Sequence, residues 1–543
     1  MSINYLKISK ASDLTGKDRT LYRVLEIIPG FLSWATLLAL LILSYFRPVW
    51  VAYFIIAFDV YWLLRVAYLS IHLFAAYAKL KRNLKVDWQE KCKTLTPNPS
   101  PTASLVGEEH KIAQNEEVTN SRQYVNLTSQ GVSWQEIYHL IILPTYTEKY
   151  QVIRASLEAL VNDGYPTNKM IVVLAIEERA GPGYQKQAIL IKEEFGEKFR
   201  NFLITIHLAD IEGEIKGKGS NQAWAARQVK NKIIDQDNLD YGKIIVSTFD
   251  IDTCVNPGYF YCLTYNFLTV AKPHQASYQP VPVYHNNLWQ APFFARTTAI
   301  SNTFWQMMQQ IRKERLATYS SHSMSWKALV EIDFWQTNMV SEDSRIFWHC
   351  LNFYHGDYQV EPLYFPVSMD VCMDKNKWRT LKNLYKQQRR WGWGVENIPY
   401  IMFNFIKDKQ FRLRKKIFYT LIQLEGFHSW ATNALIIGLI GWMPMILGGD
   451  RFNVTVLSSN LPFVTRMLMT LAMIGMVVSA IVSTLLLPKR PVKYGFFKSL
   501  VMVLQWIFLP VTIIFFGAIP GLDAQTRLML GKYMGFWVTP KKR

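Results

Sequence analysis

Cysteine is scarce in this chain of 543 residues, and its placement excludes two common kinds of structural site. The five cysteines are scattered, with neither a C-x-x-C pair nor the Cys and His spacing of a zinc ligand set. All five fall in a stretch that the charge pattern assigns to the cytosol, where thiols stay reduced. We therefore expect neither disulfides nor structural zinc. The sequence also lacks internal repeats and a cleavable signal, because the first apolar run is too long for a signal core.

Acidic residues are outnumbered by basic ones, 41 against 60, which gives a formal net charge of +19. Such an excess can indicate nucleic-acid binding. Here, however, basic residues cluster beside apolar runs, as in KLKRNLK at 79–85, where they would face anionic lipid headgroups. We therefore expect membrane lipid as a partner and no nucleic acid.

Long apolar runs are the dominant feature of a chain that is 50% hydrophobic and 14% aromatic. The first run, Ile27 to Phe46, carries no charge over about 20 residues, the length that crosses roughly 30 Å of hydrocarbon. A second run, Val49 to Ala78, follows after a short turn and predicts a helical hairpin. Further runs cover 416–447, 463–487 and 498–519.

Basic residues before the first run and after the second predict the orientation of the chain. By the positive-inside rule, the N-terminus and residues 80–415 are cytosolic. We therefore expect a multi-pass protein of the cell inner (plasma) membrane with a large cytosolic region. Within it, residues around 94–122 are rich in Pro, Ser, Thr and Glu, a composition typical of a flexible linker.

Beyond this linker, β-type and helical patterns alternate, which predicts an α/β domain with a mostly parallel sheet. In such sheets ligands bind beyond the carboxyl ends of the strands. The predicted strands are 137–143, 170–176, 203–209 and 243–249, with helices near 148–162 and 220–234. The expected organisation is two transmembrane helices (1–90), a linker (91–130), the cytosolic domain (131–375), amphipathic interface helices (376–415) and a C-terminal transmembrane region (416–543).

Two pairs of acidic residues lie beyond the predicted strands. Asp250 and Asp252 come directly after the fourth predicted strand, and in extended chain their side chains would point the same way. Two carboxylates so placed can hold a hard divalent cation, although a pair of solvated turn aspartates is equally consistent. Glu342 and Asp343 are, as a bare dipeptide, typical of a helix N-terminus.

The order of three short motifs is more specific than any one of them. Asp250-Ile-Asp252, then Glu342-Asp343, then QQRRW at 387–391, in a cytosolic α/β domain between membrane spans, resembles the processive family 2 glycosyltransferases, the group of cellulose and hyaluronan synthases. The resemblance implies a GT-A (Rossmann-like) fold, a nucleoside-diphosphate sugar donor, expected to be a UDP-sugar, and Mn²⁺ or Mg²⁺ as cofactor.

The resemblance also implies roles for single residues. Asp252, with Asp250 nearby, would hold the metal, and Asp343, beside Glu342, would be the catalytic base. Gln387 and Trp391 would bind the acceptor, and Gly392 and Gly394 would let a glycan approach; a lipid-anchoring belt is the alternative. The implied donor-binding residues are Thr145, Tyr146, Glu148, Glu177, Lys218 and Arg390.

This sequence departs from the family pattern at two places near the expected nucleotide. Thr147 stands where an asparagine is usual, and Glu177 and Glu178 stand where aspartates are common. Both departures concern which donor is bound.

The C-terminal GFWVTPKKR resembles the gating loop of cellulose synthases, a cytosolic segment that closes over bound nucleotide; a basic tail lying on anionic lipid is the alternative. Three full crossings after the domain would place this tail outside, so we expect residues 498–519 to enter the membrane and return, with Pro510 at the break. The gating residues would be Phe536, Val538, Thr539 and Lys541.

The sequence thus predicts an inverting, metal-dependent membrane glycosyltransferase that builds, and can translocate, a polysaccharide. One alternative is transfer of a single sugar to a lipid-linked acceptor. Another, of a different class, is a catalytically silent scaffold or transporter, which would be expected to have lost the carboxylates that are present here.

Overall fold

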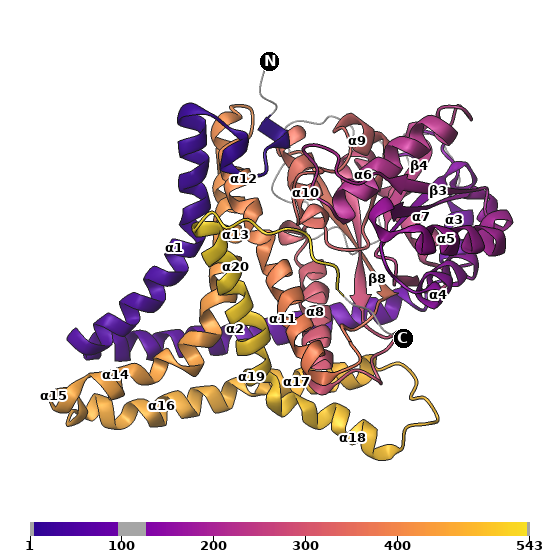
Figure 1. Cartoon of the computed structure of the whole chain (residues 1–543). Coiled ribbons are helices and arrows are strands. Elements are labelled where there is room, and N and C mark those ends of the chain that lie inside the picture. The colour runs from indigo at the N-terminus through magenta and orange to yellow at the C-terminus, as the bar shows by residue number, and fades with distance from the viewer. Residues whose placement is uncertain (1–4, 96–125, 540–543) are drawn as a thin grey trace.

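The computed structural model describes residues 5–95 and 126–539, and shows an α/β domain joined to a set of long helices (Figure 1). Most of the predicted linker, residues 96–125, lies outside the described residues, as does Lys541. The first part of the predicted linker belongs to a short helix, α3 (Trp88–Thr94), whose Trp88 and Cys92 are buried against the α/β domain.

An eight-stranded mixed sheet forms the centre of the α/β domain, in the order β3-β2-β1-β4-β7-β6-β8-β5. The four predicted strands are its parallel half, since β1 pairs with both β2 and β4, and β2 with β3. The near-continuous apolar sequences of β1, β2 and β4 are almost entirely buried, as expected for strands covered on both faces, whereas the edge strand β3 is only partly buried. The four strands are β1 (Tyr138–Thr145), β2 (Met170–Glu177), β3 (Asn201–His207) and β4 (Ile244–Thr248).

The other half of the sheet was not predicted. β7 (Ser323–Ser325) pairs antiparallel with β4 and with β6 (Ala276–Val283). β8 (Gln359–Ser368) runs parallel to β6, and β5 (Cys254–Val255) lies antiparallel at the edge. These strands are short or contain proline, so they carry no clear alternating pattern.

Helices cover both faces of the sheet and bury two apolar cores (Figure 1). One face is covered by α4 (Tyr150–Val161), α5 (Pro182–Phe195) and α7 (Tyr259–Thr269), and the other by α6 (Lys218–Val229), α9 (Trp326–Glu331) and α10 (Glu342–Phe353). α6 packs against β1, β2 and β3, and its first residue, Lys218, contacts Asp250 just after β4 and Asp343 at the start of α10.

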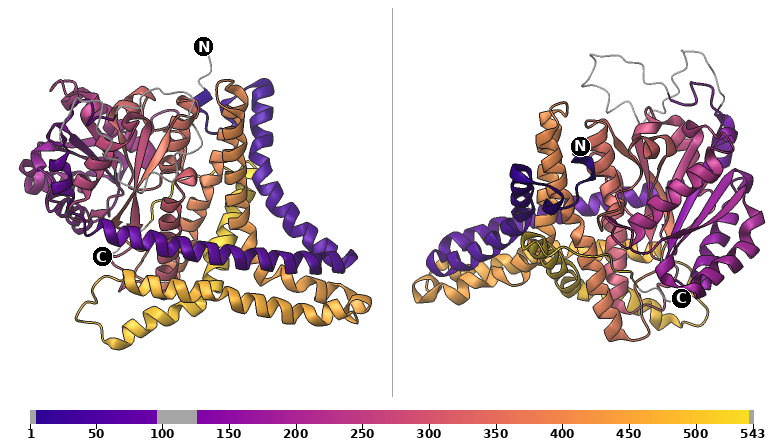
Figure 2. Two further views of the ribbon diagram at one scale, coloured as in Figure 1. Left: turned by 180° about the vertical axis from the view of Figure 1, so that it is seen from behind. Right: turned by 45° about the horizontal axis from the view of Figure 1, so that its top comes forward.

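The membrane helices match the predicted apolar runs. Four helices are long and apolar enough to cross a membrane, namely α1 (Gly16–Phe46), α2 (Pro48–Asn83), 456–486 and 497–529. A bent pair, α13 (Leu413–Gly438) with the segment up to Leu447, would be a fifth. In both views of Figure 2 the α1–α2 turn and the turn before α16 (Val456–Ala472) lie together, at the end farthest from the sheet.

Residues 498–519 do not form the hairpin that we expected of a segment that enters the membrane and returns. They form α18 (Phe496–Leu504), α19 (Leu509–Ile513) and the start of α20 (Ile519–Met529), consecutive segments that do not fold back on one another (Figure 1). Pro510 lies in the first turn of α19, where its missing N–H costs no helical hydrogen bond. The C-terminal tail, residues 530–539, then runs back toward the sheet.

The predicted interface region connects the two parts. It consists of α11 (Lys377–Gly392), a 3-10 turn η12 (Trp393–Glu396) and α12 (Asn397–Lys407). α11 packs against α20 and also contacts α8 (Phe293–Ile311), a long helix of the α/β domain. The chain's first described residues, 5–14, dock nearby, where Ile8 accepts hydrogen bonds from Gln336 and Arg345.

Candidate active site

Lys218 lies at the centre of an acidic cluster drawn from three separate segments. Its Nζ atom is 2.7 Å from Oδ1 of Asp250, which follows β4, and 2.8 Å from both oxygens of Asp343 at the start of α10. Glu342 is 3.8 Å away. The structure therefore brings together the two acidic pairs and the lysine that the sequence placed far apart.

Burial and charge act in opposite directions on this lysine. Burial by itself lowers the pKa of the Lys218 ammonium, but the surrounding carboxylates raise that pKa well above its ordinary value. For Glu342, burial and the neighbouring Asp343 carboxylate raise the pKa to about 8. The cluster therefore holds one firmly charged lysine and an acid pair in which Glu342 gains a proton more readily than a free glutamate.

Asp250 and Asp252 lie in a turn and not in extended chain as we expected, and each has its own partners. β4 ends at Thr248, and the aspartates lie in the turn that follows. Asp250 faces Lys218 and accepts a hydrogen bond from Ser320 Oγ at 2.6 Å. Asp252 is almost fully buried and accepts one from the Asp370 amide at 2.9 Å.

The residues around Asp252 fit a hard divalent cation once a donor is bound. No group of three or more His, Cys, Asp or Glu side chains in the described parts of the chain is arranged to hold a metal by itself. Mg²⁺ is commonly held by one or two carboxylates while substrate phosphates supply further oxygens. Asp250 and Asp252 are such carboxylates, at the sheet edge where the predicted donor would lie.

Asp370, Ser320 and His322 were missed by sequence reasoning. Asp370 follows β8 and is buried beside Asp252, with its Oδ1 accepting a hydrogen bond from Asn286. The imidazole of His322 is buried near Asp343, and burial lowers its pKa to about 4. No motif indicated these residues, because they lie beside β7 and β8, strands that the sequence pattern did not reveal.

The turn after β1 places Thr145, Tyr146 and Glu148 together. One carboxylate oxygen of Glu148 accepts hydrogen bonds from Thr145 Oγ1 at 2.8 Å and from the Tyr146 amide at 2.7 Å. Glu148 is therefore occupied in shaping the turn. The guanidinium of Arg179 lies 4.3 Å from the centre of the Tyr146 ring and also pairs with Glu177, at the end of β2.

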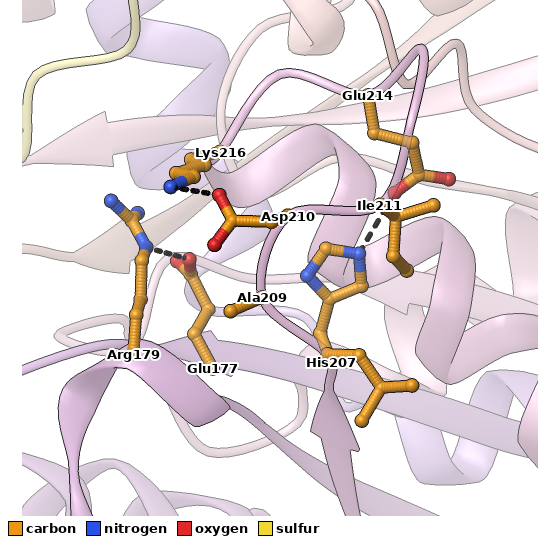
Figure 3. A pocket seen from close by; sticks show the side chains of 9 residues that line it. Glu177, Arg179, His207, Ala209, Asp210, Ile211, Glu214 and Lys216 are labelled. Carbon is orange, nitrogen blue, oxygen red and sulfur yellow. Dashed lines mark hydrogen bonds and ion pairs between the residues drawn. The ribbon is translucent and has the colours of Figure 1, made fainter.

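A small pocket opens next to this pair at the ends of β2 and β3 (Figure 3). Figure 3 shows Arg179 directed toward Glu177 and Lys216 toward Asp210. On the far side, His207 Nε2 lies 2.8 Å from Glu214. The chain between β3 and Lys218 forms part of the lining, so the pocket and the acidic cluster are connected by one loop.

The QQRRW segment forms the last turn of α11, next to the acidic cluster. Arg390 acts electrostatically on Glu342, and its guanidinium lies 5.1 Å from the centre of the Phe536 ring. Arg389 pairs instead with Asp523 of α20 at 3.0 Å. Gln387 is half-buried, as is Trp391, which packs against an apolar cluster that includes residues of α8 and α18.

Gly392 and Gly394 serve helix packing, not glycan access. A Cβ atom on Gly392 would lie 3.2 Å from the Cα of Gly521 in α20. One on Gly394 would lie 3.4 Å from the ring of Phe427. The space that we expected to be open to a sugar is therefore filled by protein.

The C-terminal tail reaches the same site. Phe536 packs so closely on Gly217 that a Cβ atom there would lie 2.6 Å from the phenylalanine ring. Trp537 lies under the Lys386 ammonium, 5.3 Å from ring centre to Nζ, while Val538 is half-buried and Thr539 is buried. The tail thus touches both the loop before Lys218 and the QQRRW helix.

Solved structures that resemble this one are distant. The mannosyltransferase PcManGT from Pyrobaculum calidifontis, in complex with GDP-Man and Mn²⁺, matches with 12% identity and a TM-score of 0.38, covering 79% of this chain and 98% of that one. S. aureus TarS 1-349 in complex with UDP-GlcNAc matches with 11% identity and a TM-score of 0.29, covering 64% and 90%. None of the curated proteins matches the chain.

A family model gives the decisive comparison. The model described as glycosyl transferase family group 2 matches residues 245–519, half of the chain. The match begins in β4, before the aspartate pair, and extends through Glu342, Asp343 and QQRRW to α20. Together with the sheet order, this agrees with the GT-A fold and flanking membrane helices expected from the sequence, and the chain belongs to the family 2 group of glycosyltransferases.

Proposed function

We propose that the protein is a multi-pass enzyme of the plasma membrane that transfers sugar from a nucleoside-diphosphate donor, a UDP-sugar, with its catalytic domain in the cytosol. The observation that carries the proposal is the contact of Lys218 with Asp250 and Asp343. It brings Asp250 after β4, the acid pair and the start of α6 into one site. A catalytically silent scaffold would not be expected to keep so many partly buried charges, because burying a charge costs folding free energy.

The reaction that fits these groups is an inverting displacement. The acceptor hydroxyl attacks the anomeric carbon of the donor sugar while the bond from that carbon to the diphosphate breaks. Asp343 takes the hydroxyl proton, and the nucleoside diphosphate leaves with the bonding electron pair. General-base assistance of this kind contributes roughly 10²–10⁴-fold.

A divalent cation, Mn²⁺ or Mg²⁺, would be held by Asp252 with Asp250 nearby, and would neutralise charge on the departing diphosphate. Lys218 and Arg390 are the protein's own cations beside that position. Both oxygens of Asp343 are engaged by Lys218 here, so the base becomes available when Lys218 turns to the donor phosphates. Donor binding would thereby prepare the base.

The remaining roles follow from position. Thr145, Tyr146 and Glu177 lie at the ends of β1 and β2, where the nucleoside would bind, with Glu148 supporting their turn. Gln387 and Trp391 would contact the acceptor. The tail, through Phe536, Val538 and Thr539, would cover the nucleotide; Lys541, the fourth predicted gating residue, lies outside the described residues.

The test is donor turnover by the purified full-length protein in lipid nanodiscs. A panel of nucleoside-diphosphate sugars with Mn²⁺ is offered, and released nucleoside diphosphate is measured. Metal-dependent release from one donor, abolished in Asp343→Asn, is expected. Release that is absent for every donor, or equal in the variant, would refute the proposal. Product length then separates polymer synthesis from transfer of a single sugar to a lipid-linked acceptor.

A further inference from the structure

The residues that follow QQRRW have no role in the proposed reaction. Two of them make buried hydrogen bonds to the residues around the acid pair. Glu396 and Asn397 lie where the 3-10 turn η12 passes into α12. Both are buried, with 6% and 2% of their surface exposed. Neither side chain contacts the lysine cluster, so any effect on it must act through α10.

Glu396 holds the backbone at the start of α10. Its Oε1 accepts hydrogen bonds from the amides of Ser341, at 2.9 Å, and Val340, at 3.3 Å. Ser341 is the N-cap residue of α10, directly before Glu342. An N-cap amide has no partner within its own helix, and a glutamate three residues later often supplies one. Here a glutamate 55 residues away does so.

The second oxygen of the same carboxylate connects α10 to the QQRRW segment. Oε2 of Glu396 accepts a hydrogen bond from the indole nitrogen of Trp393 at 2.8 Å. Trp393 is fully buried and lies two residues after Trp391. One carboxylate therefore fixes the distance between the acid pair and the end of the predicted acceptor-binding helix.

Asn397 and Arg345 hold the next turn of α10. The Arg345 guanidinium donates from Nε to Asn397 Oδ1 at 2.6 Å and from Nη2 to the Glu396 carbonyl at 3.3 Å. The amide of Asn397 donates in return to Ser344 Oγ at 2.9 Å. Arg345 is itself almost fully buried. Charged hydrogen bonds of this kind are short and directional, so they fix both the rotation and the position of the helix.

We propose that Glu396 is a positioning residue, which sets the place of Asp343 by holding the N-terminus of α10 against the turn after QQRRW, with Asn397 supporting it through Arg345. The proposal rests on the proposed function for its catalytic consequence. A displacement of a catalytic group by about 1 Å can cost roughly 10²-fold in rate. Donor binding should be little affected, because the expected donor-binding residues other than Arg390 lie outside α10 and α11.

The first experiment compares Glu396→Ala and Glu396→Gln with Asn404→Ala. Asn404 is an equally buried polar residue of α12, but its amide bonds only within its own helix, to the Tyr400 carbonyl. In Glu396→Ala we expect kcat to fall roughly 10²-fold with the donor KM unchanged. Glu396→Gln should fall between wild type and alanine, because an amide keeps one acceptor oxygen. Asn404→Ala should keep the wild-type kcat.

A second readout does not need activity. Hydrogen–deuterium exchange of the full-length protein in nanodiscs reports the amides of residues 338–347. In Glu396→Ala these should exchange roughly tenfold faster, with no such change in Asn404→Ala. Unchanged exchange would overturn the proposal, and so would a fall in kcat matched by an equal loss of donor affinity. If wild type turns over no donor, the proposed function fails, and exchange still decides whether Glu396 holds α10.

Discussion

Lys218 Nζ lies 2.8 Å from each carboxylate oxygen of Asp343, so the group that we expect to accept a proton is held by the group that we expect to meet the diphosphate. The contact joins the first residue of α6 to the second residue of α10. Since the donor's phosphates would compete with Asp343 for the lysine, this pair connects donor binding to base activation.

Replacing Asp343 with asparagine should remove the base but no metal ligand. We expect turnover to fall by roughly 10²–10⁴-fold. Donor affinity should be at least that of wild type, because the donor phosphates no longer compete with the Asp343 carboxylate for Lys218. Nucleoside diphosphate release and equilibrium donor binding are the measurements. Asp357→Asn, which alters an exposed aspartate paired with Lys272, serves as control. Substantial residual turnover in Asp343→Asn would reject this residue as the base.

Replacing Asp252 with alanine should abolish metal-dependent donor binding as well as turnover, because the diphosphate then lacks its counter-ion. Titration calorimetry with the donor, in the presence and absence of Mn²⁺, measures the difference. In wild type Mn²⁺ should strengthen binding, and in Asp252→Ala it should not. If Mn²⁺ strengthens donor binding by Asp252→Ala as much as by wild type, then other groups hold the metal.

Replacing Trp391 with alanine should impair transfer to acceptor more than hydrolysis of the donor by water, if the indole face carries the acceptor sugar. Trp378 is the matched control, since 79% of it is exposed and it lies at the opposite end of α11 from QQRRW. If Trp391 only anchors the helix to lipid, transfer and hydrolysis should fall equally in Trp391→Ala. Trp378→Ala should then show a comparable loss.

Removing the tail from Phe536 onward should raise the donor KM, because Phe536 packs on Gly217 and under Arg390. Removing only the last three residues, 541–543, leaves those contacts and tests Lys541 separately. Donor KM and the thermal unfolding temperature are measured together. A tail that merely lies on lipid would leave the donor KM unchanged in both truncations.

Glu342 makes stability depend on pH in a defined direction. Its pKa in the folded protein, raised to about 8 by burial and Asp343, exceeds its ordinary value of 4.5. Between pH 4.5 and about pH 8 the native state therefore binds more protons than the unfolded chain. The contribution of Glu342 to the free energy of unfolding is complete below pH 4.5 and is lost as the pH rises through about 8. The unfolding temperature of wild type should fall relative to Glu342→Gln between pH 5 and 9.

The matched control for that comparison is Glu314→Gln, at an exposed glutamate. It should follow wild type at every pH. Wild type and Glu342→Gln following parallel curves would show that Glu342 titrates in the folded protein as it does in the unfolded chain.

The parallel half of the sheet could be predicted because its strands are short runs of buried Val, Ile and Leu separated by amphipathic helices. The other half could not. β6 reads ASYQPVPV and β7 reads SMS, so neither shows a strand's alternation, and their pairing depends on partners more than 30 residues away.

The candidate site was predictable where a residue follows a strand or belongs to a short motif. Asp250, Glu342, Asp343 and Lys218 meet as their order in the chain suggested. The partners of the two aspartates were not predictable, because Ser320 and the Asp370 amide come from distant parts of the chain. The use of Gly392 for packing against Gly521 depends on a contact between helices far apart in sequence, which no local pattern encodes.

The contact of Phe536 with Gly217 also constrains how the chain is threaded through the bilayer. Two residues in contact are on the same aqueous side, so the chain between them crosses an even number of times. Three apolar helical runs lie between α12 and the tail: α13 with the segment to Leu447, 456–486 and 497–529. If all three crossed the bilayer, Phe536 and Gly217 would lie on opposite sides of it, so we expect one of the three to lie in the membrane without crossing. The last run is the one that packs on α11, beside the acid cluster. A helix in contact with lipid would then also form a wall of the reaction site, so that bilayer thickness and composition become variables of catalysis.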